Sequence, residues 1–69
     1  MTDQTYAITD IVGTSKEGVE DAVPNGIRKA SETLRNLDWF EVTEIRGSLA
    51  HTGEVQQFQV TMKLGFRYE

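Results

Sequence analysis

Cysteine is absent from this chain of 69 residues, and proline, tryptophan and histidine occur once each. Without cysteine there is no disulfide framework and no thiol nucleophile. One His among scattered carboxylates lacks the ligand spacing of a closed zinc site, so we expect no metal. No apolar run is long enough to span a bilayer, and residues 1–5 are polar without a basic segment. We therefore expect no membrane partner and a cytoplasmic location.

Basic residues are also scarce, since seven Lys and Arg stand against eleven Asp and Glu, giving a net charge of −4. This balance disfavours nucleic acid as the main ligand. At 38% hydrophobic the chain is expected to fold, as a single domain of residues 1–69. A core of this size, without disulfides or zinc, is barely sufficient to stabilise a folded monomer. We therefore expect self-association to stabilise the fold.

The first half of the chain predicts a strand followed by a helix. Residues 6–12 are β-branched and aromatic and end at Gly13, which is typical of a strand. Ser15 is the expected N-cap of a helix of about five turns. Its apolar stripe comprises Val19, Ala22, Val23, Gly26, Ile27, Ala30, Thr33, Leu34 and Leu37. Pro24 lies inside this stripe, and two interpretations stay open: one kinked helix, or two helices separated by a turn.

The second half predicts two strands joined by a tight turn. Residues 39–49 form the expected second strand, 50–53 the turn, and 54–68 the third strand. From Phe58 to Tyr68 apolar and polar residues alternate strictly, so one face of the third strand is apolar. The only available cover for that face is the helix. The expected fold is therefore α+β, with β-α-β-β order and a three-stranded antiparallel sheet packed on one long amphipathic helix.

The sequence contains no convincing catalytic group. His51 lies in the predicted turn, where a lone His is usually solvated. Glu41 and Glu44 are expected on opposite faces of their strand, which disfavours a paired acid and base. Neither a P-loop nor a dinucleotide-binding glycine motif occurs. Residues 13–15 could hold an anion before the helix, although a simple connecting turn is the stronger interpretation. We expect no enzymatic activity.

The polar face of the sheet is the remaining candidate for function, because the helix covers only the other side. Phe40 and Val42 are the expected core residues of the second strand. The third strand presents Gln57, Gln59, Thr61, Lys63 and Arg67 on the open face, and the second presents Trp39, Glu41, Thr43 and Ile45.

Trp39 is the unusual member of this face, because a large exposed aromatic ring often marks an interface or a ligand platform. The alternative, that Trp39 covers the helix end and packs in the core, stays open. A tryptophan can stack on a planar heterocycle, while a glutamine such as Gln59 can both donate to and accept from its edge. Arg46 and Arg67 could then bind a phosphate.

The chain resembles the dodecin family over nearly its whole length. The resemblance rests on Ile11-Val-Gly-Thr-Ser15, on Ala30-Ser-Glu-Thr-Leu-Arg-Asn-Leu-Asp-Trp-Phe-Glu-Val42, on Ile45-Arg-Gly47 and on Phe58-Gln-Val-Thr-Met-Lys-Leu-Gly-Phe-Arg67. It implies a flavin-binding subunit of a hollow homododecamer. Such proteins store and buffer flavin, hold it between tryptophans of neighbouring subunits, and quench its excited state by electron transfer from the indole.

The resemblance also implies cofactor-binding roles for four residues. Trp39 matches the stacking tryptophan, Gln59 the residue that hydrogen-bonds the ring edge, and Arg46 and Arg67 the arginines near the pocket. FMN is the expected ligand, with riboflavin and FAD as alternatives. Coenzyme A also binds some bacterial members, although no residue here can be assigned to it. Pro24 departs from the commoner family pattern, in which a helix-forming residue stands at this position.

Two questions stay open from the sequence. Arg46 has the wrong parity for the open face, so either a β-bulge turns it outward or it reaches a ligand bound by a neighbouring subunit. The function could also be that of a cofactor-free oligomeric structural or adaptor domain. A small flavin-dependent oxidoreductase is disfavoured, because no general acid or base is positioned.

Overall fold

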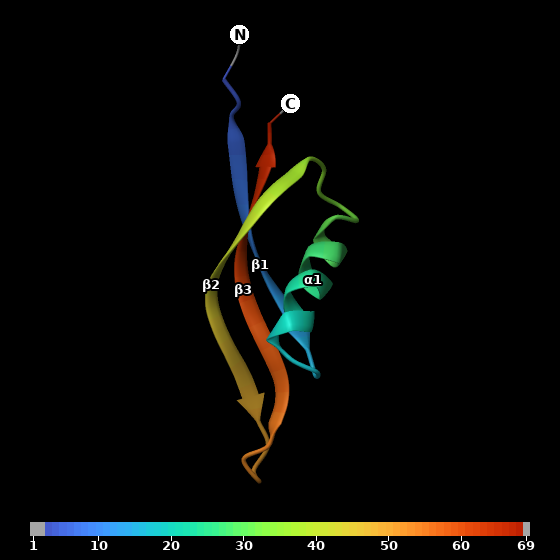
Figure 1. Cartoon of the computed structure of the whole chain (residues 1–69), viewed down its shortest axis with the longest axis vertical. Helices are drawn as coiled ribbons and strands as arrows, with labels where there is room; N and C mark the ends of the chain where they lie inside the picture. The colour runs from blue at the N-terminus through green and yellow to red at the C-terminus, as the bar shows by residue number, and fades with distance from the viewer. Residues whose placement is uncertain (1–2, 69) are drawn as a thin grey trace.

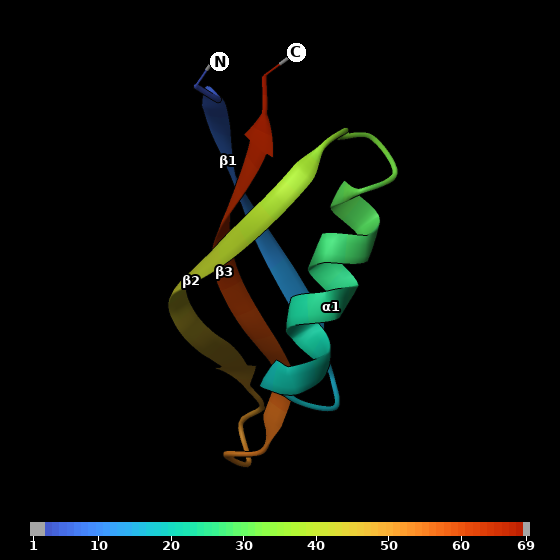
Figure 2. The ribbon, with the colours of Figure 1, turned by 45° about the horizontal axis from the view of Figure 1, so that its top comes forward.

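A computed structural model of the chain describes residues 3–68. The elements run β1 (Tyr6–Ser15), α1 (Val19–Ala30), β2 (Leu37–Leu49) and β3 (Val55–Arg67). Strand β3 lies in the middle of an antiparallel sheet of order β1-β3-β2 (Figure 1). The helix lies along one face of this long, twisted sheet (Figure 2). The predicted β-α-β-β order and sheet are confirmed.

The core lies between β3 and the helix. Val60, Met62 and Leu64 alternate along the helix side of β3 and are at most 1% exposed. Ala22 of α1 is fully buried in a cluster with Val60 and Met62. Around this cluster pack Ile11, Val19, Val23 and Ile27. The alternation predicted for β3 is thus confirmed at its centre.

Two glycines allow the helix to approach β1 closely. A Cβ on Gly13 would overlap the carbonyl oxygen of Ala22, and a Cβ on Gly26 would lie 2.9 Å from the Cα of Gly13. Any side chain at either position would therefore push α1 away from the sheet. This contact fixes the helix over β1 and β3.

Strand β2 lies mostly outside the cover of the helix. Phe40, Val42 and Ile45 face the helix side of the sheet, since they pair with Leu64, Met62 and Val60 of β3. They are nevertheless 49%, 39% and 59% exposed. A helix is about 10 Å across and strands lie about 4.8 Å apart, so one helix covers about two strands. The expectation that Phe40 and Val42 are core residues is therefore wrong for the single chain.

The helix begins later than predicted. Ser15 is the last residue of β1, and Gly18 is the N-cap of α1 without any side-chain cap. The Ser15 Oγ instead accepts hydrogen bonds from the backbone N–H groups of Glu17 (2.9 Å) and Gly18 (3.4 Å). Ser15 therefore stabilises the connecting turn, and its predicted role as N-cap is wrong. Residues 13–15 belong to a strand and do not form the predicted turn.

The helix also ends earlier, at Ala30. The hydroxyl groups of Ser31 and Thr33 donate to the carbonyls of Arg28 and Ala30 and so compete with helix propagation. Asn36 then has a φ of 63°, in the left-handed region that ends a helical path. Residues 31–34 still wind in turns, which explains why the apolar spacing continues beyond the helix.

Pro24 lies within one continuous helix, so the interpretation as two helices is wrong. Its ring is on the exposed side of α1, where the carbonyl of Glu20, which loses its usual N–H partner, can bind water. The next residue, Asn25, donates from Nδ2 to the carbonyl of Thr14 at 3.1 Å. The helix is thus tied to β1 directly beside the proline.

Candidate ligand-binding face

A β-bulge in β2 reverses the direction of every side chain that follows it. The register between β2 and β3 shifts between Val42 and Glu44, and the Thr43 hydroxyl donates to the carbonyl of Thr61 at 3.2 Å. Beyond the bulge Arg46 pairs with Gln59, so Arg46 shares its face. The bulge, one of the two open explanations for Arg46, is therefore confirmed.

The same bulge overturns two expectations. Ile45 pairs with Val60 and so lies on the helix side, where the strict alternation predicted it on the open face. Glu41 and Glu44 lie on the same face, because they pair with Lys63 and Thr61. The statement that these two carboxylates occupy opposite faces is wrong.

The face away from the helix, here called the outer face, combines polar side chains of all three strands with a few apolar ones. It comprises Tyr6, Ile8, Asp10, Val12 and Thr14 of β1, Trp39, Glu41, Glu44, Arg46 and Ser48 of β2, and Gln57, Gln59, Thr61, Lys63, Gly65 and Arg67 of β3. All four residues predicted as a binding site lie on this face.

Two of those four residues, Arg46 and Gln59, contact each other. The Arg46 Nε donates to Gln59 Oε1 at 2.9 Å, and Gln59 Nε2 donates to Gln57 Oε1 at 2.9 Å. Arg46 also lies 3.8 Å from the carboxylate of Glu44. The amide of Gln59 is thus held on both sides, which determines which of its atoms is the oxygen.

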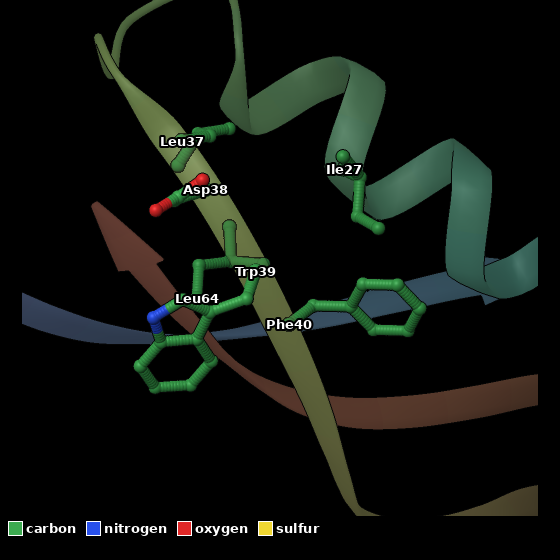
Figure 3. A pocket seen from close by; sticks show the side chains of 6 residues that line it. All are labelled: Ile27, Leu37, Asp38, Trp39, Phe40 and Leu64. Atoms are coloured by element: carbon green, nitrogen blue, oxygen red, sulfur yellow. The ribbon is translucent and has the colours of Figure 1, made fainter. Parts of the chain in front are cut away.

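Trp39 lies on the outer face at the other end of the sheet. It pairs with Gly65, and its indole covers the position that a Gly65 side chain would occupy. Trp39 and Phe40 leave β2 in opposite directions, with Phe40 toward α1 (Figure 3). The indole remains 39% exposed. The interpretation that Trp39 packs in the core is therefore wrong.

A small apolar pocket of about 150 Å³ lies between α1 and the start of β2. Trp39 contributes to its margin, together with Ile27, Leu37, Asp38, Phe40 and Leu64 (Figure 3). The lining is mostly apolar, with Asp38 as its one charged residue, so the pocket offers few groups that could orient a polar heterocycle.

Arg67 lies near Trp39 and pairs with Tyr6 of β1. The hydrogen bond between the Tyr6 hydroxyl and Asp38 raises the pKa of Tyr6, and partial desolvation and the charge of Asp38 raise it further, whereas Arg67 lowers it. Asp38 is the residue at which the register between β2 and β3 first shifts. Tyr6 and Asp38 therefore join β1 to β2 across the end of the outer face.

The outer face thus holds two separate clusters, one around Gln59 and one around Trp39. Along β3, the six residue-to-residue steps from Gln59 to Gly65 span about 20 Å, and the eight steps from Gln59 to Arg67 span about 27 Å. An extended arginine reaches only about 7 Å from its Cα by standard bond lengths. Arg46 and Arg67 of one chain therefore cannot contact the same phosphate.

The structure also bears on His51, on metal binding and on membrane-spanning helices. His51 lies exposed in the turn of residues 50–53, where Gly53 N–H donates to the carbonyl of Ala50. Among residues 3–68, no three His, Cys, Asp or Glu side chains gather as a metal site. No helix of the described chain is long and apolar enough to cross a membrane.

Sequence reasoning missed the contacts that support the predicted residues. Gln57 was placed on the outer face, and its alternation with Gln59 could have indicated that the two amides meet. The alternation of β3 places Gly65 on the polar face but does not show that its missing side chain makes room for Trp39. The link between Tyr6 and Asp38 had no signal in the sequence, because it joins strands that are not neighbours.

Comparison with known proteins identifies the family. Residues 5–69 match the family model described as Dodecin. A dodecin from Thermus thermophilus is 48% identical over 64 residues, which cover 93% of this chain and 91% of that protein. The structure of a dodecin from Streptomyces davaonensis has a TM-score of 0.92 and 59% identity, covering 99% of this chain and 98% of that one. The dodecin structure from Streptomyces coelicolor also has a TM-score of 0.92, with 54% identity and coverage of 100% and 97%. With this extent of sequence and structural agreement, the chain belongs to the dodecin family.

Proposed function

We propose that this protein stores and buffers flavin, with FMN as its main ligand, and quenches the excited state of the bound flavin. Membership in the dodecin family supports flavin binding by a small protein. The observation that carries the proposal is the outer face, where a half-exposed indole and an oriented glutamine amide stand among polar side chains.

The donor set of this face fits a flavin ring. Trp39 offers a flat, electron-rich surface for stacking, and Gln59 offers both a donor and an acceptor for the ring edge. Bound flavin supplies a planar, light-absorbing ring system. Trp39 would stack on that ring and would donate to the excited flavin an electron that returns to the indole by charge recombination, while Gln59 would set the orientation of the ring.

The proposed assembly is a homododecamer, and two features of the chain support self-association. First, the Trp39 cluster and the Gln59 cluster lie about 20 Å apart along the sheet, so a compact site gathers groups from more than one subunit. Second, Phe40, Val42 and Ile45 are left open on the helix side, and a single core of this size is barely stable. Neighbouring subunits would bury these side chains.

A phosphate on the ligand distinguishes FMN from riboflavin, and Arg46 and Arg67 are the proposed cations that bind it. A chain with a net charge of −4 repels a phosphate unless local cations offset this field. Because one chain cannot bring both arginines together, each of them binds phosphate alone or with a neighbouring subunit. Binding of coenzyme A stays a further proposal without assigned residues, as does a cytoplasmic location.

No chemical turnover is part of this proposal, and dodecins are not known as enzymes. The competing function is that of a cofactor-free oligomeric adaptor. The exposed apolar residues of β2 favour association in either case, so exposure alone does not separate the two.

Gel filtration with absorbance read at protein and flavin wavelengths tests the proposal. We expect the purified protein, after incubation with FMN, to elute as an assembly of twelve 7.8-kDa chains that carries the flavin absorbance. An assembly that elutes without flavin, even from excess FMN, would refute the proposal and favour the cofactor-free adaptor.

A further inference from the structure

We propose that Gln57 is a positioning residue that holds the amide of Gln59 in the one orientation that presents a donor and an acceptor side by side to the ligand. This inference rests on the proposed function, because it assigns Gln59 to the ring edge. It extends the site to a residue that does not itself contact the ligand.

The geometry assigns Gln57 this role through its own side chain. Gln57 and Gln59 lie two residues apart on the outer face of β3, and Gln57 Oε1 accepts from Gln59 Nε2 at 2.9 Å. This hydrogen bond is partly buried, so water competes with it less than on an open surface. Gln57 pairs with Ser48 of β2, next to the strand end.

Counting donors and acceptors shows what is left for a ligand. A glutamine amide has two N–H groups and an oxygen with two lone pairs. Gln57 takes one N–H, and Arg46 Nε occupies one lone pair at 2.9 Å. One N–H and one lone pair of Gln59 remain, and they belong to the same planar group.

Both contacts are needed to keep this pattern. The terminal torsion of a glutamine is broad, so an amide held at one atom can still turn about that contact. Arg46 fixes the oxygen and Gln57 fixes the nitrogen, which leaves the plane of the amide with one orientation. The ligand chemistry that matches is a flat heterocycle whose edge places a carbonyl beside an N–H, as the pyrimidine ring of a flavin does.

Titration of the flavin-free assembly with riboflavin tests the role, because riboflavin has the ring without the phosphate. We expect Gln57→Leu to raise the Kd about 3- to 10-fold, as for the loss of one net hydrogen bond. Gln57→Glu should bind with nearly the wild-type Kd, because its carboxylate still accepts from Gln59 Nε2. The threonine of Gln57→Thr is too short to reach Gln59 Nε2, so this variant should bind riboflavin as weakly as Gln57→Leu. It replaces Gln57→Leu in the test if the leucine variant does not assemble.

A double-mutant cycle separates positioning from direct contact. If Gln57 acts through Gln59, adding Gln57→Leu to Gln59→Leu should raise the Kd no further. Gln56→Leu is the control for substitution of a neighbouring glutamine, since Gln56 is exposed, is skipped by the pairing of β2 with β3, and is not the residue to which Gln59 Nε2 donates. It should bind like wild type.

The outcomes distinguish this inference from the proposed function. Failure of the wild-type protein to bind riboflavin would refute both. With wild-type binding intact, the positioning role is refuted by an unchanged Kd for Gln57→Leu. It is also refuted if Gln57→Glu is as weak as Gln57→Leu, or if the penalty persists on the Gln59→Leu background.

Discussion

Replacing Gly65 by alanine should displace Trp39 while leaving the fold nearly intact. The added Cβ would overlap the Cε2, Cζ2 and Nε1 atoms of the indole, which covers this position. Carbon atoms in contact normally lie about 3.5–4.0 Å apart, so the ring must retreat by at least ~1 Å. Because the indole is 39% exposed, it has room to turn toward solvent.

Two opposing effects determine how much Gly65→Ala changes the free energy of unfolding. Overpacking a well-filled site costs about 1–3 kcal/mol. Because the indole can turn toward solvent, we expect the cost of Gly65→Ala to be near the lower end of this range. Gly→Ala at a compatible backbone also stabilises by about 0.4–1 kcal/mol through the unfolded chain. The free energy of unfolding should therefore fall by about 1 kcal/mol or less. Flavin affinity should fall more clearly, about 5-fold or more, because stacking is worth about 1–3 kcal/mol per base.

Two assays follow this change. Trp39 is the only tryptophan, so intrinsic fluorescence reports its environment alone, and riboflavin titration reports the stacking surface. Gly18→Ala is the control, because nothing lies within 4 Å of a Cβ placed there. Wild-type emission together with a wild-type riboflavin Kd in Gly65→Ala would refute the placement of Trp39 over Gly65.

Three further predictions concern the core, the phosphate and the pH dependence. Gly13→Ala should destabilise the fold by about 1–3 kcal/mol, because its Cβ would overlap the carbonyl of Ala22, and chemical denaturation measures this loss. Arg46→Ala should weaken riboflavin, because Arg46 holds Gln59, and should weaken FMN more, because the phosphate also loses a cation. Arg67→Ala should weaken FMN alone, by about 1 kcal/mol and less at high salt, in calorimetric titrations at two ionic strengths; an equal loss for both flavins would contradict this. The hydrogen bond to Asp38 raises the pKa of Tyr6, so this bond stabilises the fold below pH 10. The stabilisation is lost as the pH rises through the pKa of Tyr6 in the folded protein. Thermal unfolding of Tyr6→Phe should accordingly lose less stability between pH 9 and pH 11 than wild type.

The sequence was sufficient to predict the elements and most of the outer face. The strict alternation from Phe58 onward identified β3 as a strand with one buried face, and its central residues are the core. The positions of Trp39, Gln59 and Arg67 on the outer face followed from the same counting. These predictions succeeded because side-chain direction in a regular strand depends on parity alone.

The sequence-based predictions were wrong where a single residue changes the direction of the backbone or of the side chains that follow it. The hydrophobic pattern of β2 does not locate the bulge at Thr43, which the sequence offered only as one of two explanations for Arg46, yet the bulge reverses Glu44, Ile45 and Arg46. The end of the helix at Ala30 depends on side-chain hydrogen bonds and on one left-handed residue, while the apolar spacing continues beyond it. The incomplete cover of β2 depends on where the helix is anchored, which periodicity does not specify.

The measurement that tests the central claim most directly is the titration of a fixed amount of riboflavin with wild-type protein and with Trp39→Leu, followed by flavin fluorescence. We predict saturable loss of flavin emission with wild type, and with Trp39→Leu weaker binding in which the bound flavin stays emissive. Flavin emission that wild type leaves unchanged, or that both proteins quench equally, would contradict binding and quenching by Trp39.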